Sequence, residues 1–133
     1  MSPCLRGIVA ITAAGLWVNA SEFFRNEVLL KSYWVAHYQS LGLVFPSEPV
    51  NGMVWGLWGF TSAAAIYWVS RKFSLIETVL LCWLMTFVLM WLVTGNLHVL
   101  PGGLLYYAVP LSLLEVFVGV LICRKLAPPC VTG

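Results

Sequence analysis

The sequence predicts an all-α integral membrane protein, an antiparallel four-helix bundle with both termini in the cytoplasm. Of its 133 residues, 61% are hydrophobic and 9% are charged, and the mean hydropathy is +0.92. A soluble domain carries roughly 25% charged residues, so this chain lacks the polar side chains that a water-facing surface needs. The composition excludes an ordinary cytosolic enzyme and a disordered chain. Scattered basic residues give no sign of a nucleic-acid partner.

Four segments support the bundle, and together they make the whole chain, residues 1–133, one transmembrane domain. A helix needs about 20 mostly apolar residues to cross the roughly 30 Å hydrocarbon core of a membrane. The turn after the second segment is so short that the second and third helices must be antiparallel neighbours. The expected helices span residues 7–30, 52–70, 75–93 and 103–123.

Local signals mark where these helices start. Pro46 and Pro49 interrupt the chain before the second helix. Ser74, followed three residues later by Glu77, has the pattern of a capping box that opens the third helix. The boundaries therefore agree with the hydropathy pattern.

The distribution of Lys and Arg predicts the orientation, because cytoplasmic loops carry an excess of them. Lys31 lies on one side, in the loop 31–51, which we expect to be outside together with the loop 94–102. We therefore expect a multi-pass protein of the plasma (inner) membrane. The opposite, cytoplasmic side holds Arg6, Arg71, Lys72, Arg124 and Lys125.

The first segment also permits a second interpretation. Arg6, the apolar run 8–18 and the small residue before Ser21 fit a secretory signal peptide with a cleavage site. Against it, the polar residues after position 18 continue the helical face of the preceding segment. The sequence leaves open whether residues 1–20 are removed.

Small residues form a stripe on the second helix, at spacings that place them on one face. Such residues let membrane helices approach closely. The stripe suits packing within the chain, and it also suits contact with a second copy or another membrane protein. We expect lipid to cover the remaining faces. The stripe consists of Gly52, Gly56, Gly59 and Ala63.

Glu115 is the residue that most strongly indicates a functional site, because ionisable residues inside membrane spans are rare and usually have a function. Helical rise places it about 12 Å from the cytoplasmic end, level with Gly15 and Cys82 and with no Lys or Arg at that depth. We therefore expect a carboxyl that is uncharged at neutral pH and faces the bundle. Ser112, one turn away, is the other candidate on this helix.

The first helix carries further candidates for binding or proton relay. Glu22 and Arg25 are three residues apart and can pair along the helix, and Asn26 can join them. Asn19 is expected to bridge helices. We expect no catalytic residue, no cofactor and no metal site, because nucleotide, hydrolase and zinc motifs are absent from the sequence.

These residues favour a small transporter or channel-like protein with a protonatable intramembrane glutamate. An accessory subunit of a larger membrane complex is the alternative, and an enzyme acting on a lipid-like substrate is the third possibility. In size and topology, the predicted arrangement of four short spans with one membrane glutamate is similar to that of small multidrug-resistance exporters. The charged pair of the first helix and the segment 110–115 do not fit that family.

Overall fold

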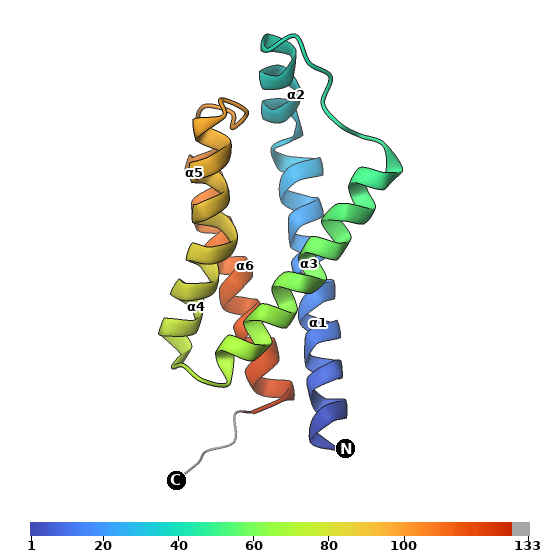
Figure 1. The fold of residues 1–133 in the computed structure, drawn as a ribbon, viewed down its shortest axis with the longest axis vertical. Coiled ribbons are helices and arrows are strands. Elements are labelled where there is room, and N and C mark those ends of the chain that lie inside the picture. Colours follow the sequence, from blue (N-terminus) through green and yellow to red (C-terminus); the bar gives the residue numbers. More distant parts are fainter. Residues whose placement is uncertain (129–133) are drawn as a thin grey trace.

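The computed structural model describes residues 1–128, and within that range it contains helices and no strands (Figure 1), which confirms the all-α prediction. Two of the elements are π-helices, labelled η, and each continues an α-helix directly. In chain order the elements are α1 (Pro3–Phe23), η1 (Phe24–Leu29), α2 (Lys31–Ser40), α3 (Pro49–Ser70), α4 (Leu75–Trp83), η2 (Leu84–Val88), α5 (Leu89–Asn96) and α6 (Leu105–Leu126).

Three helices in the described part of the chain are long and apolar enough to cross a membrane, as expected of a membrane protein. They are the continuous helix of α1 and η1 (27 residues), the continuous helix from α4 to α5 (22 residues) and α6 (22 residues). Helix α3 is also 22 residues long and has no charged residue. Its glycine, tryptophan and small polar residues keep its hydropathy below that of the other three.

Residues at the helix ends explain several boundaries. The hydroxyl of Ser2 accepts a hydrogen bond from the Leu5 N–H, and Pro3 occupies the first turn, so α1 begins there. The capping box of Ser74 and Glu77 is present at the start of α4, as predicted. Between the first two long helices lies α2, a short helix with no buried residue that the sequence analysis did not anticipate.

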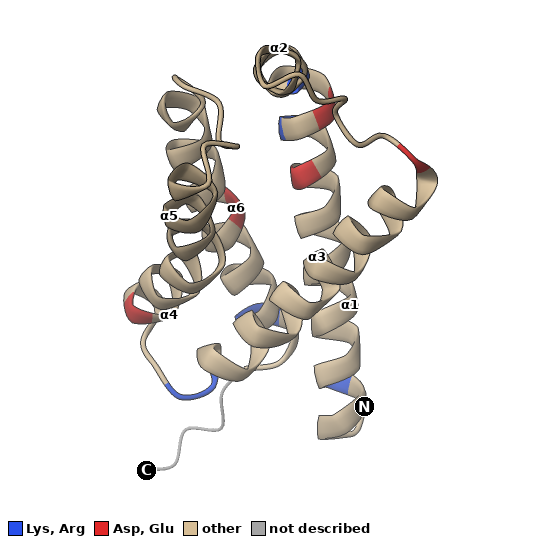
Figure 2. Ribbon diagram, turned by 45° about the horizontal axis from the view of Figure 1, so that its top comes forward, with Lys and Arg blue, Asp and Glu red and all other residues tan. Residues whose placement is uncertain are grey.

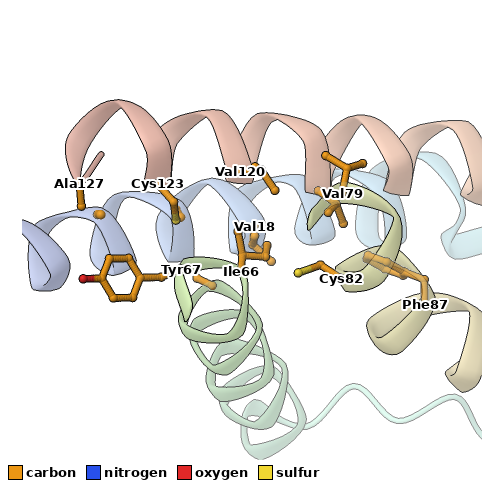
Figure 3. Close-up of a cluster of buried hydrophobic side chains, with 13 residues drawn as sticks. Val18, Ile66, Tyr67, Val79, Cys82, Phe87, Val120, Cys123 and Ala127 are labelled. Carbon is orange, nitrogen blue, oxygen red and sulfur yellow. The ribbon is translucent and has the colours of Figure 1, made fainter. Parts of the chain in front are cut away.

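Helix α1 packs against α3 and α6, and α4 packs against α6 and α3. The N-terminal end of α1 and the C-terminal end of α6 lie at the same end of the molecule (Figure 1). A cluster of buried apolar side chains fills the space between these helices (Figure 3). Several of its members are small, among them Ala10, Ala14 and Ala63, which lets the backbones approach closely.

The small-residue stripe of α3 is divided between two environments. Ala63 is fully buried, and a Cβ added at Gly59 would lie 2.6 Å from the side chain of Asn19 on α1. Asn19 itself donates hydrogen bonds to the carbonyl oxygens of Gly15 (2.9 Å) and Gly56 (3.4 Å), so it bridges α1 and α3 as expected. At Gly52 nothing lies within 4 Å of an added Cβ.

These two environments predict that a glycine-to-alanine substitution has different effects on stability at Gly59 and at Gly52. Gly59→Ala should lower the free energy of unfolding by about 1–3 kcal/mol, because the new methyl group forces Asn19 out of the α1–α3 contact. Gly52→Ala gains the same helix propensity without a clash and should not destabilise. Unfolding of the detergent-purified variants measures both, and equal stabilities would show that this contact tolerates a methyl group.

Candidate functional site

The main polar feature of the interior is a cluster in which Arg25 lies between two carboxylates. Arg25 and Glu22 come from neighbouring turns of the first helix, and Glu115 comes from α6. Their exposed fractions are 4%, 7% and 1%. Arg25 Nη2 pairs with Glu22 Oε1, and Arg25 Nη1 lies 3.1 Å from Glu115 Oε2. Figure 2 shows the acidic segment of α6 beside the charged segment of the first helix.

The pairing with Arg25 corrects the expectation that Glu115 has no cationic partner. The structure sets Glu115 beside Ser21, more than one turn beyond Gly15, with which helical rise had aligned it. Side chains lean toward the N-terminus of their own helix. Because α1 and α6 are antiparallel, Arg25 and Glu115 lean toward each other. The lack of a cation at its depth is therefore no longer a reason to expect an uncharged carboxyl, whereas its burial remains one.

Two residues that the sequence analysis missed also hold Glu115. The Ser21 hydroxyl donates a 2.8 Å hydrogen bond to Glu115 Oε2, and Trp17 Nε1 donates one of 2.9 Å to the main-chain oxygen of Glu115. Trp17, Ser21 and Arg25 are each four residues apart, so they share one face of the first helix. That spacing is the signal in the sequence that could have identified them.

A second branch of hydrogen bonds leads from the cluster toward α2. Asn26 Nδ2 donates to Glu22 Oε2 at 2.8 Å and to the Glu22 carbonyl oxygen at 3.2 Å. Trp34 Nε1, on α2, donates to Asn26 Oδ1 at 3.1 Å. The expected contact of Asn26 with Glu22 is therefore present, and it extends the polar network to the end of the first helix.

Both π-helices border this site. Arg25 lies in η1, and its guanidinium carbon is 5.0 Å from the ring centroid of Phe87, which lies in η2. The faces of aromatic rings attract cations. Trp58 and Trp91 pack against Phe87 at centroid distances of 5.6 and 5.7 Å. The π-helix is rare and appears frequently at functional sites.

Two of the six candidate residues make contacts elsewhere. Ser112 donates to the carbonyl oxygen of Val109 at 3.0 Å and accepts from Trp83 Nε1 at 2.9 Å, which ties α6 to α4. Asn19 makes the α1–α3 contact described above. The cluster proper therefore contains Glu22, Arg25, Asn26 and Glu115.

The charges within the cluster do not balance. Two carboxyl groups share one guanidinium, and no other described basic side chain forms an ion pair with either carboxyl. With both carboxyls ionised the cluster would have one excess negative charge in a site removed from water, which is unfavourable. One bound proton, shared between coupled groups, would neutralise it.

Two surface cavities lie away from this cluster. One, of about 310 Å³, lies at the N-terminal end of α1, and the other, of about 210 Å³, lies beside α2. Neither is lined by a residue of the cluster. Comparison of the chain with family models, curated proteins and solved structures finds no match.

The cluster predicts strong coupling between its three charges. Arg25→Gln should lower the free energy of unfolding by about 3–5 kcal/mol, because it leaves two buried carboxyl groups without a cation. Adding Glu22→Gln and Glu115→Gln to the same protein should restore at least half of that loss. Unfolding of the detergent-purified variants measures both effects.

The exposed Glu27–Lys31 pair (2.6 Å) provides the control. Lys31→Gln should cost less than about 1 kcal/mol, since exposed ion pairs contribute little. Strictly additive losses among the three cluster substitutions would contradict the shared role of Arg25.

Proposed function

We propose that this chain is a small transport or channel-like membrane protein whose buried Glu22–Arg25–Glu115 cluster binds and releases one proton. The observation that supports the proposal is the single guanidinium between two carboxyl groups. A purely structural pair would need one carboxylate, whereas the second gives the cluster a place for an exchangeable proton. The bordering π-helices agree with a site that changes its hydrogen bonding.

We further propose that α3 provides a fourth span, which completes an antiparallel four-helix bundle in the plasma membrane. At about 1.5 Å per residue its 22 residues extend over about 33 Å. It packs against α1 and α6 and has no charged side chain. Five of the seven basic residues gather where α1 begins and α6 ends, which favours a cytoplasmic location for both termini.

Transport would require more than one copy of the chain. Neither of the two described cavities is lined by a residue of the cluster, so neither provides a route to it within one copy. We propose a homo-oligomer or a membrane-protein partner that contacts the open part of the α3 stripe at Gly52 and Gly56. Gly59 and Ala63 are already packed within the chain.

The second candidate is an accessory subunit of a larger membrane complex. It is favoured by the position of both described cavities away from the cluster, because a structural charge cluster needs no access route. An enzyme acting on a lipid-like substrate is the least supported possibility. The two described cavities place no substrate next to the buried carboxyl groups.

The orientation can be tested with the native Cys4, which is exposed near the N-terminal end of α1. In cells that produce the chain with Cys130 changed to Ser, a membrane-impermeant thiol reagent should label Cys4 only after lysis. With Cys4 also replaced by Ser, a cysteine introduced at Ser47, on the α2–α3 connection, should be labelled in intact cells. The reverse pattern would invert the proposed topology.

The proton role is tested with purified protein reconstituted into liposomes that contain a pH-sensitive dye. Under an imposed potassium diffusion potential, the wild-type chain should carry protons and Glu115→Gln should reduce the flux to that of empty vesicles. Glu27→Gln, which removes an exposed carboxyl from the same helix, is the matched control and should leave the flux unchanged.

An infrared pH titration of the same proteins distinguishes the two candidates. A titrating carboxylic-acid band that disappears in Glu115→Gln supports proton exchange in the cluster. Folded wild-type protein that shows neither this band nor a flux above that of empty vesicles would reject the transport proposal and leave the accessory role.

A further inference from the structure

At the opposite end of the molecule from α2, a cavity of about 310 Å³ lies between three helix ends, away from the buried cluster. The first turns of α1, the end of α3 and the residues after α6 form its walls. Its lining includes Pro3, Cys4, Arg6, Tyr67, Arg71 and Ala127.

The chemistry of this lining is that of an anion site. Arg6 lies in α1 and Arg71 directly follows α3, and none of the described lining residues is acidic. The guanidinium carbon of Arg71 lies 5.4 Å from the ring centroid of Tyr67, which orients it at the cavity wall. Arginine is the residue best suited to recognise phosphate, because its planar fork of donors matches the phosphate oxygens.

From this arrangement we infer that the cavity binds the phosphate-containing headgroup of an anionic phospholipid. The cavity lies at the start of α1 and the end of α6, where these apolar helices leave the hydrocarbon and lipid headgroups are found. Leu5 and Trp68, next in sequence to lining residues, are 47% and 67% exposed and provide apolar surface for acyl chains. Basic pockets between membrane helices are known to bind such headgroups.

A general attraction between basic residues and an anionic membrane surface makes a different prediction. Lys72 lies two residues after the end of α3 and Lys125 lies in the last turn of α6, so both are at the same end of the molecule as the cavity, yet neither lines it. The double variant Lys72→Gln/Lys125→Gln therefore removes two positive charges from this end without touching the cavity. It is the matched control for Arg6→Gln/Arg71→Gln.

The test is a native mass spectrometry titration of the purified full chain with phosphatidylglycerol and with phosphatidylcholine of the same acyl chains. The wild-type chain should bind one phosphatidylglycerol more tightly than any phosphatidylcholine. Arg6→Gln/Arg71→Gln should weaken that binding by at least about tenfold, as expected for the loss of charged hydrogen bonds. The lysine control should change it by less than about threefold.

Two further measurements keep the outcome decisive. If the arginine double variant does not fold, Arg6→Gln alone, at an exposed position, should still weaken phosphatidylglycerol binding and leave phosphatidylcholine unaffected. Inorganic phosphate should not displace the lipid at the same concentration, and displacement would assign the cavity to free phosphate instead. Equal losses in the two double variants, or no preference for the anionic lipid, would overturn the proposal.

Discussion

Arg25 is buried among apolar helices, and its charge is compensated by carboxyl groups from two of them. Neither helix can slide or rotate without leaving a charge unpaired, which costs several kcal/mol away from water. The hydrophobic effect does not drive helices together within lipid, so polar contacts and close backbone approach determine their packing. The contacts of Trp17, Ser21 and Arg25 with Glu115 thus fix the register of α1 against α6, and the other helices pack around that pair.

The same cluster explains where the two π-helices occur. An i→i+5 turn is less favourable than an α-turn and persists where surrounding contacts support it. In η1, which begins at Phe24, the N–H of Leu30 donates to the Arg25 carbonyl oxygen at 2.9 Å, so the turn that closes this π-helix starts at the residue whose side chain joins both carboxyl groups. In η2 it occurs at Phe87, whose ring faces the guanidinium. The irregular segments of two helices therefore meet at the buried charges.

Features that depend on composition or short spacing could be predicted from the sequence. The all-helical class follows from composition. Short spacing predicts the capping box of Ser74 and the contacts among Glu22, Arg25 and Asn26, because each of these involves residues within four positions. The Arg25–Glu115 pair joins residues 90 positions apart, and it depends on the register and lean of two helices, which periodicity does not encode. Helix α2 was missed because it has no buried face, so its sequence lacks an amphipathic pattern.

The position of the cluster along the bundle makes the two ends of the bundle differ in their distance from the charges and in the polarity of the residues between. Toward α2, the hydrogen bonds of Glu22 with Asn26 and of Asn26 with Trp34 continue to the end of the first helix. Toward the basic end lies the buried apolar cluster that includes Val18 and Val120 (Figure 3), so apolar side chains follow the charges on that side. Arg25 is only four residues, about 6 Å of helical rise, from the end of η1 at Leu29. Under the proposed function, a proton that exchanged with the cluster would therefore have its shorter and more polar route from the α2 end. Passage to the other end would require the apolar core to open.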